Sequence, residues 1–103
     1  MVIYEVNIAV DDKLATDYLE WLDGHIAEML RFRGFVASRV MQVDDPPGAP
    51  GTKNYCVQYQ LVDAESLDHY LSNHAAGMRQ AGLEAFGDGF STSRRILSDY
   101  PWR

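Results

Sequence analysis

The sequence has very few residues suited to redox or metal chemistry. It contains one cysteine, Cys56, no Cys-x-x-Cys pair and three histidines that lack the spacing of a metal site. An intrachain disulfide is therefore impossible, and metal-chaperone and iron–sulfur functions are excluded. No glycine-rich phosphate loop follows the first predicted strand, where Asp11 and Asp12 would repel a phosphate. We expect neither a metal ion nor a cofactor.

Basic residues and long apolar runs are also scarce. Nine Lys and Arg residues stand against fifteen Asp and Glu residues, which gives a formal net charge of −6. This balance disfavours nucleic acid and anionic membranes as partners, since both require a basic surface. No apolar run approaches the ~20 residues that span a bilayer. Residues 1–5 lack the basic start of a signal peptide. We therefore expect a cytoplasmic protein without a nucleic-acid or membrane partner.

What the chain does contain is a strand–helix–strand pattern that occurs twice. Alternating apolar residues predict strands at 2–10, 35–43, 53–62 and 90–97, and helical spacing of apolar residues lies between 14 and 30 and between 67 and 85. The order β-α-β-β-α-β predicts an α+β, ferredoxin-like fold in which two helices cover one face of a four-stranded antiparallel sheet. At 103 residues, with 47% hydrophobic residues, we expect a single domain over 1–103.

Local signals mark the ends of these elements. We expect Asp11 or Asp12 to cap the first helix, and Gly34 to follow its last turn in the left-handed conformation. Asp63 is expected to cap the second helix and Gly87 to end it. Residues 44–52 contain three prolines and two glycines, so this segment is predicted to be an exposed, mobile connection between two strands.

The alternation within the strands predicts which side chains face the helices. Tyr4, Val6 and Ile8 on the first strand are expected to face them, together with Tyr55, Val57, Tyr59 and Leu61 on the third. A ferredoxin-like sheet leaves its other face without helices. On that open face we expect Ile3, Glu5, Asn7, Cys56, Gln58 and Gln60.

Arginines are unusually frequent in the predicted strands of this acidic chain. Because Arg94 and Arg95 are adjacent in a strand, one of them must point to each face of the sheet. Guanidinium groups on a sheet bind carboxylates and other anions. The candidate ligand-binding residues are therefore Arg39, Gln58, Arg94, Arg95 and His25. The alternative is that the arginines form internal salt bridges with Glu5 or Asp88.

His74 is the candidate catalytic residue. It lies on the apolar stripe of the second helix, and an imidazole in that position can act as a general base. The alternative is a core histidine hydrogen-bonded to a backbone carbonyl. His25 occupies the matching position in the first helix and has the same two interpretations, whereas His69 lies on the outer side of the second helix.

Short segments spread over nearly the whole chain resemble a bacterial family with a domain of unknown function: Tyr4-Glu5-Val6, Trp21-Leu22 with His25, Gly34-Phe35, Tyr55-Cys56-Val57-Gln58-Tyr59, Tyr70-Leu71 with His74-Ala75, and Phe86-Gly87-Asp88 through Arg94-Arg95-Ile96-Leu97. That family in turn resembles the dimeric α/β-barrel superfamily, whose members include cofactor-independent monooxygenases, haem-degrading enzymes and muconolactone isomerase. The resemblance implies a homodimer with a ligand pocket between sheet and helices. It carries over no catalytic residue.

The sequence therefore predicts a dimeric α/β-barrel protein that binds a small anionic or aromatic organic molecule. One alternative is a cofactor-independent monooxygenase or isomerase that uses His74 as its base, with Arg39 and Arg94 or Arg95 holding the substrate. Another is a structural or interaction module whose pocket is filled by its own side chains.

Overall fold

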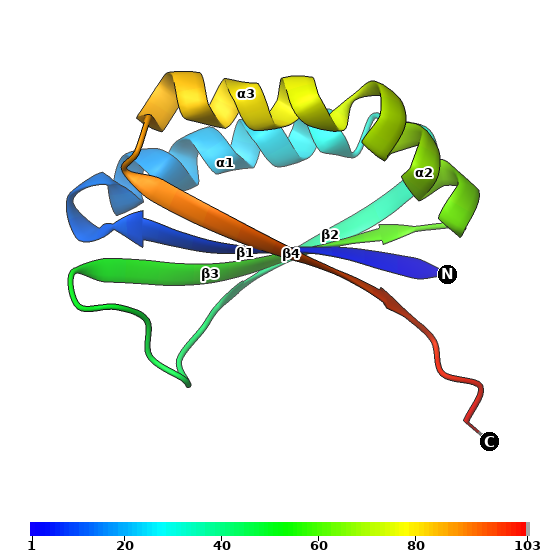
Figure 1. The fold of residues 1–103 in the computed structure, drawn as a ribbon, viewed down its shortest axis with the longest axis horizontal. Helices are drawn as coiled ribbons and strands as arrows, with labels where there is room; N and C mark the ends of the chain where they lie inside the picture. Colours follow the sequence, from blue (N-terminus) through cyan, green and yellow to red (C-terminus); the bar gives the residue numbers. More distant parts are fainter. Residues whose placement is uncertain (103) are drawn as a thin grey trace.

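The computed structural model describes residues 1–102. One antiparallel sheet of four strands, in the order β2-β3-β1-β4, carries all the helices on one face (Figure 1). The predicted ferredoxin-like α+β fold is thereby confirmed. The elements are β1 (Val2–Asp11), the 3-10 turn η1 (Asp12–Leu14), α1 (Ala15–Met29), β2 (Phe35–Gln42), β3 (Thr52–Leu61), α2 (Ala64–Asn73), α3 (Ala75–Phe86) and β4 (Phe90–Ser98).

The second helix differs from the prediction because it is divided in two at His74. This residue ends α2 with backbone angles of φ −128° and ψ −28°, and α3 begins directly after it. The side chain of Asn73 donates a hydrogen bond to the carbonyl oxygen of His69 at 2.9 Å. Such a side-chain bond competes with the helical ladder for the same carbonyl. The apolar periodicity continues across the break, so the pattern alone predicted one helix.

The predicted ends of the second helical segment are confirmed. Asp63 caps α2 by accepting a hydrogen bond from the backbone N–H of Ser66 at 2.8 Å. At the other end, Gly87 follows α3 with a positive φ of 55°. These caps satisfy backbone groups that a helix leaves without intrahelical partners.

The first helix begins and ends differently from the prediction. Neither predicted aspartate caps α1, because η1 intervenes and Leu14 precedes the helix. Gly34 does adopt a left-handed φ of 83°, but it lies in the turn before β2, beyond the C-cap Leu30. A Cβ atom at Gly34 would lie 2.2 Å from the side chain of Ser66. Glycine is therefore required here both by backbone angle and by the close approach of α2.

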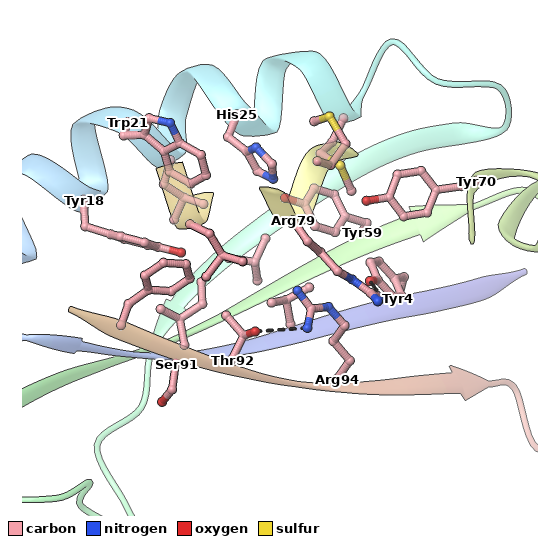
Figure 2. Close-up of a pocket in the computed structure, with 18 residues that line it drawn as sticks. Tyr4, Tyr18, Trp21, His25, Tyr59, Tyr70, Arg79, Ser91, Thr92 and Arg94 are labelled. Carbon is pink, nitrogen blue, oxygen red and sulfur yellow. Dashed lines mark hydrogen bonds between the residues drawn. The ribbon is translucent and has the colours of Figure 1, made fainter. Parts of the chain in front are cut away.

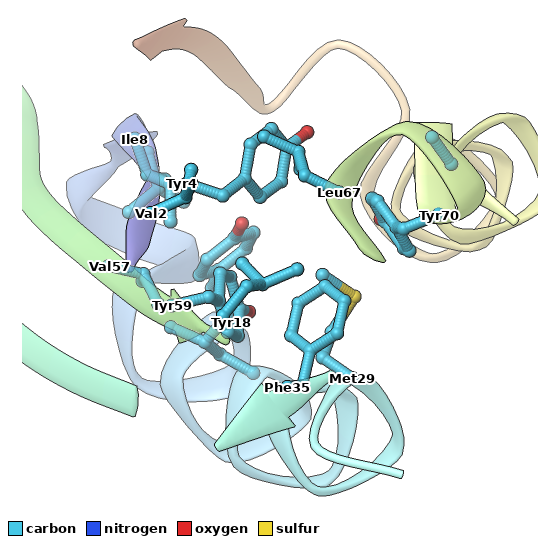
Figure 3. Close-up of a cluster of buried hydrophobic side chains, with 14 of the residues drawn as sticks. Val2, Tyr4, Ile8, Tyr18, Met29, Phe35, Val57, Tyr59, Leu67 and Tyr70 are labelled. Carbon is cyan, nitrogen blue, oxygen red and sulfur yellow. The ribbon is translucent and has the colours of Figure 1, made fainter. Parts of the chain in front are cut away.

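The hydrophobic core lies between the sheet and the helices and is rich in aromatic rings (Figure 3). The ring of Phe35 meets that of Tyr70 at a centroid distance of 5.2 Å, and Tyr4 and Tyr59 stack at 6.2 Å. A cavity in the same layer is bordered by three of these rings, those of Tyr4, Tyr59 and Tyr70.

The strand register confirms the predicted faces of the sheet and places the two adjacent arginines. Val6 pairs with Val57 on one side and with Arg94 on the other, so Arg94 shares the helix-facing side. Glu5 pairs with Gln58 and Arg95 in the same way, which places Arg95 on the open face.

The connection between β2 and β3 extends from the sheet on the side opposite the helices (Figure 1). Its end is held by the backbone N–H of Thr52, which donates to the carbonyl of Ala49 at 3.2 Å. Pro46 lines a second cavity of about 250 Å³ together with Asn7 and Ser93 of the open face. The mobility of this connection remains a prediction.

Within residues 1–102, no helix has the length and apolar character needed to cross a membrane. The same part of the chain has no cluster of three or more histidine, cysteine or acidic side chains placed to hold a metal ion.

Candidate functional site

The candidate site is a cavity of about 260 Å³ between the helices and the helix-facing side of the sheet (Figure 2). Its residues come from α1, α2, α3 and three of the strands. The cavity is therefore formed only where the helical layer and the sheet come together. Its composition has three parts: an aromatic wall, a set of hydroxyl groups and a set of basic groups.

The aromatic wall is built on α1 and the start of β4. Tyr18 and Trp21 lie three residues apart and so project from the same side of α1. The Tyr18 ring lies 5.6 Å from Trp21 and 5.3 Å from Phe90. Trp21 in turn stacks on the imidazole of His25 at 4.6 Å. These rings give a flat, apolar surface to which another flat ring can pack.

Three tyrosine hydroxyls face the cavity without a protein partner. Tyr18, Tyr59 and Tyr70 are only 3%, 2% and 2% exposed, yet none of the side-chain hydrogen bonds within residues 1–102 involves their hydroxyls. No fully enclosed side-chain oxygen or nitrogen in this part of the chain lacks a partner. The hydroxyls therefore reach the open space of the cavity, where Figure 2 shows the Tyr18 and Tyr70 oxygens directed inward.

Burial keeps these phenols protonated. It raises the pKa of Tyr18 to about 12 and the pKa of Tyr70 to about 12, and it also raises the pKa of Tyr59 above its usual value. A protonated phenol both donates and accepts hydrogen bonds. The cavity thus presents three neutral hydroxyl groups that water or a ligand must satisfy.

The charged groups of the cavity are all basic. Arg79 of α3 and Arg94 of β4 line it together with His25, whereas no aspartate or glutamate is among its described lining residues. Arg79 donates a hydrogen bond to the hydroxyl of Tyr4 at 3.2 Å. Arg94 donates one to the hydroxyl of Thr92 at 3.0 Å. Both arginines are therefore held by neutral oxygens.

The imidazole of His25 is favoured in its neutral form. Burial is the largest influence and lowers the pKa of His25 below its usual value, while Glu28 opposes the shift and Arg94 adds to it. A neutral imidazole has one ring nitrogen free to accept a proton or a hydrogen bond. His25 is thus the candidate proton acceptor inside the cavity.

The structure divides the predicted site residues between two faces of the sheet. His25 and Arg94 line the cavity. Gln58 and Arg95 lie on the open face beside Glu5, and Arg39 pairs with Gln58 there. The predicted ligand-binding residues therefore do not form one site.

His74 lies outside the cavity that was predicted to contain it. Its ring stacks on Phe32 at a centroid distance of 4.3 Å, and His74 is not among the described residues that line either cavity. The prediction was based on one continuous helix, whereas His74 lies at the break between α2 and α3. The catalytic role of His74 remains a prediction without geometric support from the cavity.

The alternative prediction was that the arginines form internal salt bridges, and Arg95 forms one with Glu5. Its Nε donates to Oε2 of Glu5 at 2.6 Å, while Gln58 and Asn7 donate to the same carboxylate at 2.9 Å each. Glu5 is only 1% exposed although it stands on the face without helices. These donors, Arg95 foremost, lower the pKa of Glu5 to about 2. Arg95 is therefore occupied by the protein itself.

Sequence reasoning missed Arg79 and the tyrosine hydroxyls. Arg79 follows Met78, an apolar residue within the helical spacing between 67 and 85, and no role was predicted for Arg79 from the sequence. Its spacing of four residues to Leu83, which also lines the cavity, was the available signal. The tyrosines were assigned to the core, and periodicity cannot show whether a buried ring also borders a cavity.

The fold and the cavity together define an α+β protein of the ferredoxin-like class with a small site beneath its helical layer. Residues 1–100 match the model of a family described as "Domain of unknown function (DUF4286)". The chain belongs to this family. Among curated proteins, no sequence matches it significantly.

Solved structures show that the fold is shared with proteins of very different origin. SnoaB from Streptomyces nogalater, a cofactor-independent oxygenase, superposes with a TM-score of 0.69 at 13% identity, covering 98% of this chain and 95% of that one. An antibiotic biosynthesis monooxygenase gives 0.66 at 12% identity over 98% and 100% of the two chains. A designed protein, Foldit4, gives 0.63 at 10% identity over 96% and 98%. These likenesses establish the fold, which by itself does not imply a function.

Proposed function

We propose that the protein binds a small aromatic molecule in the cavity between helices and sheet, and that it does so as a homodimer. The observation that carries the proposal is the set of three tyrosine hydroxyls that face the cavity without a protein partner, next to the ring wall of Tyr18, Trp21 and Phe90. Buried polar groups are normally satisfied. A pocket of mostly apolar lining with a few convergent polar groups is the usual form of a small-molecule site.

The volume of the cavity limits the size of the ligand. At about 260 Å³ it lies just below the common range of about 300–1,000 Å³ for ligand pockets. This favours a compound of one or two fused rings. The same open volume argues against a purely structural module whose pocket is filled by its own side chains.

The open face of the sheet supports the homodimer. Figure 1 looks down the 18 Å axis and shows the sheet edge-on below the helices, so the open face spans the 41 Å and 18 Å extents of the molecule, an area comparable to the about 800 Å² per partner that a stable interface buries. Ile3, Cys56 and Leu97 share this face with Glu5, whose charge is already neutralised by Arg95. A second copy of the same face is therefore the occupant we propose, as the resemblance to dimeric α/β barrels also implies.

Oligomeric state tests the dimer directly. Sedimentation velocity at micromolar concentration is expected to give a dimer for the natural sequence. Ile3→Arg, on the open face, is expected to give a folded monomer, whereas Val40→Arg, an exposed residue on the helix-facing side of β2, leaves the dimer intact. A monomeric natural protein would rule the dimer out.

Ligand binding is tested by thermal shift with one-ring and two-ring aromatic compounds. Val6 lines the cavity, so Val6→Phe fills part of it and is expected to abolish the shift caused by any binder. Val40→Phe adds the same volume at an exposed position, where it leaves binding unchanged. A ligand that stabilises both variants equally would bind elsewhere and contradict the proposal.

A second candidate function is a cofactor-independent oxygenase or isomerase. It is favoured by His25, whose neutral imidazole lies in the cavity, and by the fold shared with the oxygenase SnoaB. Here His25, rather than His74, would accept the proton from the bound substrate. Oxygen uptake with hydroquinones and no added cofactor is expected to be lost in His25→Gln and kept in His69→Gln. If the natural protein takes up no oxygen with these substrates, the oxygenase function is contradicted and ligand binding remains the proposed function.

A further inference from the structure

Two guanidinium groups meet the cavity from opposite layers of the protein. Arg79 reaches it from α3 in the helical layer, and Arg94 reaches it from β4 in the sheet (Figure 2). Both arginines influence the same buried phenol, because each lowers the pKa of Tyr70 against the effect of burial. Their charges therefore act on one region of the cavity.

Neither guanidinium is neutralised by the protein. The ion pairs among residues 1–102 are Arg33 with Glu65 and Arg95 with Glu5. Arg79 and Arg94 instead contact the neutral hydroxyls of Tyr4 and Thr92. This is notable in a chain with fifteen acidic and nine basic residues, where an acidic neighbour would be easy to supply.

The hydrogen-bonding capacity of the two groups is also largely unused. A guanidinium carries five N–H donors in a planar fork, and it matches the two oxygens of a carboxylate. One side-chain hydrogen bond is formed by each of these arginines within residues 1–102. Each fork therefore keeps donors free for an anionic group lying between them.

We propose that the ligand is an aromatic acid whose carboxylate binds between Arg79 and Arg94, while its ring packs against the wall formed by Tyr18 and Trp21. This inference rests on the proposed function and names the chemical class of its ligand. The small cavity favours a compact, planar anion attached directly to the ring. The two basic groups and the ring wall belong to the same cavity, so one molecule contacts both.

The test compares 2-naphthoate with 2-naphthamide, which has the same ring system and no charge. Trp21 borders the cavity and reports binding by fluorescence, after the exposed Trp102 is removed by Trp102→Phe in every variant. In this background, 2-naphthoate is expected to bind at least about tenfold more tightly than the amide, since hydrogen bonds to ionised groups are the stronger ones.

Substitution of each arginine shows whether the preference arises at the proposed place. Arg79→Gln and Arg94→Gln are each expected to weaken 2-naphthoate about tenfold and to leave 2-naphthamide unchanged. Arg31→Gln removes the same charge at an exposed position that lines neither cavity and is expected to change neither affinity. The two arginines lie in different elements and are both exposed. If one of the two variants fails to fold, the affinity of the other variant still tests the carboxylate site.

The outcomes separate the two proposals. Equal binding of acid and amide overturns the anionic ligand while small-molecule binding in the cavity stands. Binding of neither compound overturns both. If Arg31→Gln weakens 2-naphthoate as much as Arg79→Gln does, the preference comes from the overall charge of the protein and the carboxylate site is wrong.

Discussion

Glu5 and Arg95 form a salt bridge at 2.6 Å across neighbouring strands, on the face of the sheet that carries no helix. The preceding residue of β4, Arg94, instead lines the cavity on the other side of the sheet. Two adjacent arginines thus have different environments: one is bound to a buried carboxylate, and the other contacts a threonine hydroxyl.

Replacing Glu5 by glutamine is expected to destabilise the protein by about 2 kcal/mol. Hydrogen bonds to a charged group contribute about 1.5–3 kcal/mol, and the solvent exposure of Arg95 places the value in the lower part of that range. Urea unfolding at pH 7 and fixed protein concentration measures it. Glu65→Gln, which breaks the exposed pair with Arg33, is the control and is expected to cost less than about 0.5 kcal/mol.

The same carboxylate predicts a pH dependence of stability. The pKa of Glu5 is lowered from 4.5 to about 2 in the folded protein, so its contribution is fully present above pH 4.5 and is lost as the pH falls through 2. The difference in unfolding free energy between the natural protein and Glu5→Gln is therefore expected to shrink over this interval. A constant difference would contradict the lowered pKa.

Two glycine-to-alanine substitutions are expected to have opposite effects. Gly34→Ala combines a φ of 83° with a Cβ placed 2.2 Å from Ser66, and is expected to cost about 2 kcal/mol or more. Gly24 lies inside α1, where an added Cβ meets nothing within 4 Å, so Gly24→Ala is expected to stabilise by about 0.5–1 kcal/mol. Chemical unfolding of both variants measures the pair.

The imidazole of His25 is expected to titrate below pH 6.5, because burial lowers its pKa from that value. Arg94 adds to the shift and Glu28 opposes it. Arg94→Gln is therefore expected to raise the pKa of His25, and Glu28→Gln to lower it further. Proton NMR titration of the ring resonances distinguishes these directions, and a rise in both variants would contradict the placement of His25 between the two charges.

The connection at residues 44–52 is expected to exchange its backbone amides rapidly. Its prolines supply no N–H groups, and the amide of Thr52 is held by the carbonyl of Ala49. Hydrogen exchange read by mass spectrometry is expected to show fast exchange at residues 48 and 49 and slower exchange at Thr52. Slow exchange throughout would indicate that the connection is packed against the open face or a second copy.

The faces of the sheet could be predicted from the sequence because alternation is a strict consequence of strand geometry. Tyr4 and Val57 toward the helices, and Glu5 and Gln58 away from them, follow from it directly. The same rule could not decide between Arg94 and Arg95, since their strand is polar on both sides. The register with β1 resolves this, and register depends on pairing that a single strand does not reveal.

The site was predicted less well than the fold because it depends on how helices sit above the sheet. His74 and His25 are equivalent as positions on apolar stripes, yet one helix ends at His74 while the other continues past His25 to Met29. A local break of this kind leaves no trace in the spacing of apolar residues.

The two helices on either side of the break at His74 differ in what they bury. α2 buries Leu67 and Tyr70 in the core, whereas the buried residues of α3 are Ala75 and Gly82, both small. Arg79 and Leu83 of α3, which border the cavity, are exposed and stand outside the core cluster. Substitutions at these two positions are therefore expected to change the lining of the cavity without removing the core contacts that α2 and the sheet provide.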